Sequence, residues 1–123
     1  MFSYENLKKI LFMFEPEKAH NIAESGLKLL GKCKLLKNYY EKKNFISDER
    51  LHQKIFNVKF ENPVGLAAGF DKNATMVKAM KSMGFGFTEI GTTTPMPQDG
   101  NPKPRMFRYP NEKSVQNAMG FNN

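Results

Sequence analysis

Residues 62–74, with the sequence NPVGLAAGFDKNA, combine small side chains with charged and amide groups. Residues 67–69, Ala-Ala-Gly, carry almost no side chain, so a flat ring could lie against their backbone. Lys72 follows shortly after and supplies a cation. The pattern is compatible with a cofactor loop. It is equally compatible with a turn in which small residues let a helix pack on a strand, Asp71 or Asn73 caps that helix, and Lys72 is solvated.

Two further segments carry polar groups that could face a ligand. Thr92 offers a hydroxyl near the end of an apolar run, although a β-branched residue there also suits a strand. Residues 117–123, NAMGFNN, place three amides around a glycine. Amides both donate and accept hydrogen bonds, which suits a ring bearing carbonyl and N–H groups. The alternative for this segment is a polar turn.

The glycine spacing excludes two common phosphate-binding motifs. Only three residues separate Gly65 from Gly69, and Phe70 and Asp71 stand between the second glycine and the lysine, unlike a P-loop. In residues 84–91, GFGFTEIG, the glycines precede a strand and lack the spacing of a dinucleotide-binding fingerprint.

Composition narrows the class of function. The 123-residue chain has a net charge of +7 and a single cysteine, Cys33. A disulfide framework is therefore excluded, and Cys33 suits a buried or bystander thiol better than a nucleophile. His20 and His52 lie far apart without metal-ligand spacing, so we expect no metal site. The lysines are scattered among acids, which disfavours nucleic-acid binding but suits weak attraction to a membrane surface or a small acid.

The N-terminal residues predict a helical hairpin. Apolar residues between positions 4 and 14 recur at helical spacing, and Pro16 suits the first turn of a second helix that ends near residue 31. The apolar stripe of this second helix consists of Ala19, Ile22, Ala23, Gly26, Leu27 and Leu30. The stripe suits packing on the domain that follows, or insertion into a membrane interface with lysines near the headgroups. Residues 32–50 predict a basic linker with a short helix around residues 35–40.

The following residues predict strands and a helix in alternation. We expect a strand at 54–60, a buried strand at 62–68, a helix at 73–84, a strand at 85–94 and a loop with five prolines at 95–113. The apolar side of the helix would consist of Met76, Val77, Met80 and Met83. A strand–helix–strand unit indicates a parallel sheet, in which chemistry gathers at the carboxyl ends of the strands. AAGFDKN and GTTTP both lie there, so they could face one pocket.

In this order and spacing, NPVGLAAGFDKNA, MGFGFTEIGTTTPMPQDGNPKPRMFR and NAMGFNN resemble the quinone-dependent (class 2) dihydroorotate dehydrogenases. FEPEKAH (14–20) also resembles this class, whose N-terminal helices distinguish it from soluble class 1 enzymes. The resemblance covers essentially the whole chain. It implies an α/β fold, with the N-terminal part of a TIM (β/α)8 barrel at residues 46–123. A small helical membrane-associating segment at residues 1–45 would precede it.

The resemblance also implies an activity. The protein would be an FMN flavoprotein that oxidises (S)-dihydroorotate to orotate in de novo pyrimidine (UMP) biosynthesis and passes electrons to a membrane quinone. The helical segment would be the membrane dock and the quinone entrance. The expected localisation is therefore peripheral, on the cytoplasmic side of the cell membrane.

Matching positions carry the implied site residues. FMN would contact Ala67, Ala68, Gly69, Phe70, Asp71, Lys72 and Thr92. The substrate would contact Lys72, Asn117, Ala118, Met119, Gly120 and Phe121. Lys72 would touch both, because a cation stabilises the negative charge that a flavin gains with a hydride. Arg105 and Arg108 would lie near the place where the quinone tunnel meets the flavin.

Length and one substitution depart from the class pattern. A (β/α)8 barrel takes roughly 250 residues, so we expect this chain to be an N-terminal fragment that is inactive alone. The resemblance places the catalytic serine base beyond Asn123, and Ser114 matches no catalytic motif. Glu15 stands where the class usually has Asp, a better helix N-cap. Two alternatives are a small basic membrane-surface module without catalytic activity and a soluble class 1-like flavoenzyme.

Overall fold

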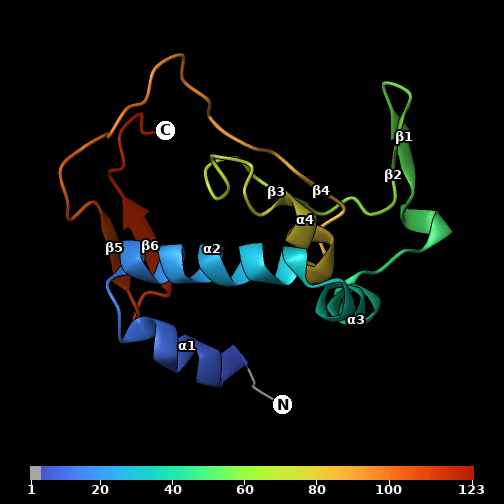
Figure 1. Ribbon diagram of the computed structural model, residues 1–123, viewed down its shortest axis with the longest axis horizontal. Helices are drawn as coiled ribbons and strands as arrows, with labels where there is room; N and C mark the ends of the chain where they lie inside the picture. Colours follow the sequence, from blue (N-terminus) through green and yellow to red (C-terminus); the bar gives the residue numbers. More distant parts are fainter. Residues whose placement is uncertain (1–3) are drawn as a thin grey trace. The chain divides into compact units, whose positions relative to one another are not determined.

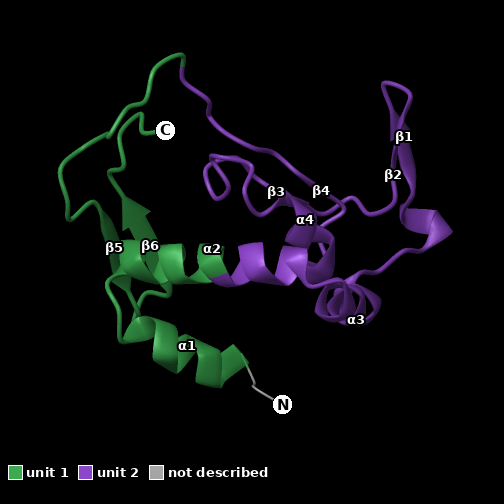
Figure 2. Cartoon of the chain, in the orientation of Figure 1, with its two compact units in different colours: residues 1–25, 95–123 green, residues 26–94 purple. Residues whose placement is uncertain are grey.

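The computed structural model describes residues 4–123 (Figure 1). The chain forms two compact units: residues 1–25 with 95–123 make unit 1, and residues 26–94 make unit 2 (Figure 2). Helix α2, Pro16–Lys32, begins in unit 1 and ends in unit 2. The boundary expected at residue 45 lies inside unit 2, so the division into residues 1–45 and 46–123 stays an expectation about function.

Unit 1 combines two helices with an antiparallel hairpin. Helix α1, Tyr4–Phe12, and the start of α2 at Pro16 agree with the sequence prediction. Strand β5, Met106–Tyr109, pairs with β6, Ser114–Asn117, so that Met106 lies opposite Asn117. The prediction of a loop throughout 95–113 is therefore wrong. The side chains of β5 alternate between half-buried and exposed, which is the pattern of a strand with one covered face.

Unit 2 contains a short parallel sheet beside small helices. Its elements in order are α3 (Lys34–Asn44), η1 (Glu49–Leu51), β1 (Gln53–Ile55), β2 (Val58–Phe60), β3 (Gly65–Leu66), α4 (Val77–Met80), η2 (Lys81–Met83) and β4 (Phe87–Thr88). Strands β3 and β4 are parallel, as expected, with Gly65 opposite Phe87. A Cβ at Gly65 would lie 2.2 Å from the Phe87 ring, so a larger residue there would displace that ring.

The apolar core of unit 2 centres on α4. Met76, Ala79 and Met80 are buried, and they pack against Leu27, Leu30, Leu66 and Phe85. The second half of the α2 stripe therefore packs against α4. Packing within the protein was one of the two alternatives that the sequence left open for this stripe. Val77 and Met83 are exposed, so the expected apolar side of the helix is only half correct.

An ion cluster joins α3 to η2. The Lys81 ammonium lies 2.9 Å from a Glu61 oxygen and 3.4 Å from a Glu41 oxygen. It also lies 4.5 Å from the centre of the Phe45 ring, within cation–π range. The hydrogen bond with Glu61 raises the pKa of Lys81, and the same bond lowers the pKa of Glu61.

Several expected elements are shorter or divided. Residues 54–60 form a hairpin rather than one strand, because Phe56 and Asn57 adopt positive φ angles and reverse the chain between β1 and β2. The strands expected at 62–68 and 85–94 are restricted to two residues each, and the helix expected at 73–84 begins at Val77. In contrast, α3 extends well beyond the short helix expected around residues 35–40.

Candidate functional site

The loop that follows β3 lies against the end of β4. Beyond the paired strands, the Glu89 N–H donates to the Leu66 carbonyl at 2.8 Å. The Gly69 N–H then donates to the Gly91 carbonyl at 2.9 Å, and the Gly91 N–H donates to the Asp71 carbonyl at 3.4 Å. The two segments expected to face one pocket are thus hydrogen-bonded to each other at the carboxyl ends of two parallel strands.

The loop presents an open surface of small residues. Ala67, Ala68 and Gly69 are exposed. Gly69 has a φ of +100°, and a Cβ placed there would meet nothing within 4 Å. The positive φ explains the glycine, and the open space leaves room for a flat group over the backbone.

The side chain of Asp71 serves local structure. It is 1% exposed, and its carboxylate accepts hydrogen bonds from the backbone N–H groups of Thr75 at 2.8 Å and Met76 at 2.9 Å. The Thr75 hydroxyl contacts the same carboxylate at 3.3 Å. Asp71 thus holds the turn that leads into α4, as the capping alternative proposed. Its backbone carbonyl accepts the Gly91 N–H and belongs to the loop.

The other expected flavin contacts differ in exposure. Lys72 is half-buried, whereas Phe70 and Thr92 are exposed. Thr92 directly follows Gly91, whose backbone contacts the loop. The backbone of unit 2 therefore brings the loop of residues 67–72 beside Gly91, which precedes Thr92. The role of these residues as flavin contacts stays a prediction.

The expected pyrimidine-binding stretch, residues 117–121, lies in unit 1. Asn117 ends β6, and its side-chain oxygen accepts the Met119 N–H at 3.4 Å, which is an Asx-type turn. Gly120 has a φ of +70° and Phe121 is exposed. The stretch is a polar turn held by neighbouring residues, which is the alternative that the sequence left open for it. Its exposed groups could still contact a ligand.

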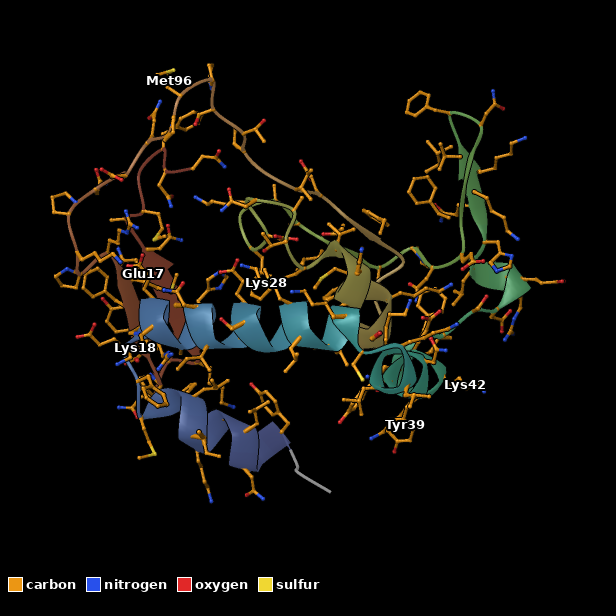
Figure 3. The ribbon with its side chains drawn as sticks, in the orientation of Figure 1. Glu17, Lys18, Lys28, Tyr39, Lys42 and Met96 are labelled. Carbon is orange, nitrogen blue, oxygen red and sulfur yellow. The ribbon has the colours of Figure 1, made fainter. Side chains whose placement is uncertain are left out.

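Arg105, which is buried, and Glu17, which is half-buried, form an ion pair beside this stretch. The Arg105 guanidinium donates to the Glu17 carboxylate, with Nη2 2.8 Å from Oε1, and Arg105 is 9% exposed. Glu17 lies in the first turn of α2 (Figure 3). The hydrogen bond from Arg105 lowers the pKa of Glu17, despite an opposing effect of burial, and Glu17 raises the pKa of Arg105. Lys103 contacts the same carboxylate at 3.2 Å.

Arg108 holds the turn between α1 and α2. Its Nη1 donates to the Phe14 carbonyl at 3.0 Å and to the Leu11 carbonyl at 3.4 Å, and its guanidinium lies 4.6 Å from the centre of the Phe12 ring. The Leu11 carbonyl also accepts the Phe14 N–H at 3.3 Å, and the shorter bond of the arginine is to a carbonyl of the turn that follows α1. Both arginines singled out in the sequence line one hollow of about 520 Å³ together with Phe12, Glu17 and Phe107.

Sequence reasoning missed two side chains that organise these loops. Glu17 was not singled out because its partner lies 88 residues away. Asn62 is buried, and its side chain joins the Val64 N–H at 2.8 Å to the Ile46 carbonyl at 3.1 Å. A buried amide with both donor and acceptor satisfied fixes the start of β3. The asparagine before a proline was a visible turn signal, but its partners were not.

A family model described as dihydroorotate dehydrogenase matches residues 50–123. The chain belongs to the dihydroorotate dehydrogenase family. Curated relatives named dihydroorotate dehydrogenase (quinone) are 55% identical in Sulfurovum sp. over 99% of this chain, and 54% identical in Sulfurimonas denitrificans over 100% of it. The resemblance found in the sequence is therefore confirmed. The chain spans about a third of the length of these relatives, 34% and 35% respectively.

Solved structures of the family support the α/β fold. A crystal structure of DHODH from Eimeria tenella in complex with ferulenol has a TM-score of 0.62 and 43% identity, covering 87% of this chain and 26% of that chain. A ligand-free DHODH from the same organism gives a TM-score of 0.58 at 42% identity, covering 83% of this chain and 27% of that one.

Two features are absent from residues 4–123, the described part of the chain. Within that range, no helix has both the length and the apolar character needed to cross a bilayer. The same range contains no group of three or more His, Cys, Asp or Glu side chains arranged to hold a metal ion.

Proposed function

We propose that these residues form one part of a quinone-dependent dihydroorotate dehydrogenase, an FMN enzyme of pyrimidine biosynthesis that oxidises (S)-dihydroorotate to orotate and reduces a membrane quinone. The observation that carries the proposal is identity above 50% over essentially the whole chain to relatives named for this activity. The complete enzyme would be a TIM barrel, and residues 1–45 would form the membrane-associating segment at the cytoplasmic face of the cell membrane.

The loop after β3 fits a flavin. A planar ring needs exposed backbone without side chains, and Ala67, Ala68 and Gly69 provide it. Lys72 follows on the same loop, where its ammonium would stabilise negative charge on a ring or on a carboxylate substrate. Bound FMN would supply hydride acceptance and electron transfer. Thr92 would contact it from the segment that follows β4.

The other roles are divided between the units. Residues 117–121 would hold the pyrimidine, with the Asn117 amide facing its carbonyl and N–H groups. The hollow lined by Arg105, Arg108 and Phe12 would receive the quinone, since it combines an apolar wall with cations. The serine base expected beyond Asn123 stays a prediction.

A chimaera tests the proposal. This chain replaces the matching first third of the Sulfurovum sp. relative, and the intact relative is the control. We expect the purified chimaera to hold FMN, measured by its visible absorbance, and to reduce a soluble quinone only when dihydroorotate is added. FMN-free protein, or flavoprotein that does not oxidise dihydroorotate while the control does, would exclude the proposal.

The alternative, a membrane-surface module without catalysis, makes a different prediction. Under it, the chimaera would bind vesicles but hold no FMN. A soluble class 1-like enzyme would be indicated if deletion of residues 1–45 from the chimaera left quinone reduction unchanged.

A further inference from the structure

The Arg105 side chain joins three segments of unit 1. Its Nε and Nη2 donate to the Glu17 carboxylate at the start of α2. Its Nη1 donates to the backbone carbonyls of Asp99 and, at 3.1 Å, Asn101. A planar guanidinium with several fixed donors can bind a carboxylate and two carbonyls at once, which the point charge of a lysine cannot reproduce. The pair therefore fixes the loop 98–105 to α2.

That loop in turn holds the stretch 117–123. The connections are backbone and amide hydrogen bonds of 2.8–3.0 Å: Ala118 N–H to Arg105 O, Asn101 N–H to Met119 O, Asn101 Nδ2 to Ala118 O, and the reciprocal pair between Gln98 and Asn123. Both peptide groups that flank Ala118 are thus held by residues of the loop.

The two segments also approach too closely to move independently. A Cβ on Gly100 would lie 2.3 Å from the Met119 carbonyl oxygen, and one on Gly120 would lie 3.1 Å from Asn101. Both glycines have positive φ angles, of +78° and +70°. A shift of the loop therefore shifts the backbone of residues 118–120.

We propose that Glu17 and Arg105 are positioning residues for pyrimidine binding: through the loop 98–105, their ion pair sets the backbone of residues 117–121. The inference rests on the proposed function, which assigns the pyrimidine to that stretch. It adds that the first turn of α2, beside the hollow assigned to the quinone, is mechanically joined to the substrate stretch. Neither residue needs to touch the substrate to affect its binding.

The first test uses the chimaera with the substitutions Glu17→Gln, Arg105→Lys and both together. Displacement of a substrate-binding backbone weakens binding steeply, so we expect each single variant to raise the Kd of orotate about tenfold. The Kd is measured from the change in flavin absorbance on titration. The double variant should be little worse than either single one, because both break the same pair.

Two matched controls isolate the pair. Glu15→Gln removes an exposed carboxylate two residues away, and Lys103→Met removes the exposed second cation of Glu17. Both should leave the Kd of orotate within twofold. Variants that retain FMN and lose thermal stability, but bind orotate as the parent does, would overturn the inference. An unsubstituted chimaera that does not oxidise dihydroorotate would instead count against the proposed function.

The second test does not depend on catalysis. Amide hydrogen exchange is measured by NMR on the 123-residue chain and its variants. In Glu17→Gln and Arg105→Lys, the amides of Asn101, Ala118 and Asn123 should exchange at least about fivefold faster, since their partners are no longer fixed. In Glu15→Gln they should be unchanged. Equal rates in all variants, or unprotected amides in the parent chain, would overturn the inference.

Discussion

At the scale of single residues, the same loop carries a structural acid and a candidate ligand cation side by side. Asp71 is buried and its carboxylate is occupied by two backbone N–H groups and a hydroxyl. Lys72 is only half-buried. The acid therefore shapes the loop. Under the proposed function the lysine would instead act on the bound ring or substrate, so substitutions of the two should have different consequences.

We predict that Asp71→Ala lowers the free energy of unfolding of the chain by about 1–3 kcal/mol, because buried N–H groups lose their acceptor. Asn73→Ala, at the other candidate cap, should change it by less than about 0.5 kcal/mol, since Asn73 is exposed. Urea denaturation followed by circular dichroism measures both. A larger loss of stability in Asn73→Ala than in Asp71→Ala would show that Asn73, and not Asp71, caps the helix.

A second prediction at this scale concerns acid. Arg105 lowers the pKa of Glu17 in the folded chain, so folding favours the carboxylate. The stabilisation is then fully present above the ordinary glutamate pKa of about 4.3. It is lost as the pH falls from there through the lowered folded value. Glu17→Gln removes this titration, so the stability difference between the parent chain and the variant should shrink below about pH 4. A stability difference between the parent chain and Glu17→Gln that stayed constant from pH 7 to pH 3 would contradict an ion pair between Glu17 and Arg105.

The sequence predicted which residues lie near one another where those residues belong to one motif or to neighbouring strands. The residues of 67–72 and Thr92 come from a contiguous loop and its neighbouring strand, so strand order alone placed them together. The Glu17–Arg105 pair joins positions that no local pattern relates. Its two members stand beside prolines, where the sequence indicates only a helix start and a loop.

At the scale of elements, short strands are fixed by glycines. Gly86 lies directly before β4, and a Cβ there would lie 2.1 Å from the Asn62 carbonyl oxygen. The Gly86 N–H donates to the Val64 carbonyl at 2.8 Å, which extends the pairing of β3 with β4. Close approach of two backbones, rather than a positive φ, thus requires this glycine.

We predict that Gly86→Ala lowers the free energy of unfolding by about 1–3 kcal/mol, as overpacking against rigid backbone does. Gly26→Ala is the matched control, because it lies within α2 and its Cβ would meet nothing within 4 Å. That substitution should stabilise the chain by up to about 1 kcal/mol through helix propensity. Thermal and urea melts of both variants measure the two effects. Equal effects of the same sign would mean that β3 and β4 do not approach as described.

Element type was predicted better than element extent. Parallel pairing followed from the strand–helix–strand order, and both N-terminal helices followed from apolar spacing. The β1–β2 turn was missed because Phe56 and Asn57 contain no glycine, the usual signal for a two-residue turn with positive φ. The helix before η2 was predicted too long because Asp71 takes the backbone N–H groups of Thr75 and Met76 into a turn.

At the scale of the whole molecule, little apolar surface is buried. The buried hydrophobic residues among positions 4–123 are Ala19, Met76, Ala79 and Met80, whereas large side chains on every helix are exposed. Under the proposed function, further barrel strands would cover part of this surface, and the membrane would cover part of the helices. The charge of +7 adds attraction to anionic lipid.

Substitutions of two isoleucines with nearly equal exposure can distinguish membrane docking by residues 1–45 from nonspecific adsorption of exposed apolar side chains. Ile10 on α1 is 44% exposed and Ile55 on β1 is 45% exposed. If residues 1–45 dock on the membrane, Ile10→Ser removes apolar contact with the bilayer, and the chimaera should bind vesicles containing anionic lipid several-fold more weakly. Ile55→Ser should bind as the parent does.

Salt should weaken the binding of all three proteins, because dissolved ions screen the attraction between the lysines and anionic lipid. The Debye length is about 10 Å at 0.1 M and shortens as the salt concentration rises. Cosedimentation at low and high salt measures both effects. Equal losses in the two serine variants would show that vesicle binding reports general exposure of apolar residues. If Ile10→Ser leaves vesicle binding unchanged but salt weakens it, the attraction comes from the lysines alone. Only a loss confined to Ile10→Ser supports an interfacial role for α1.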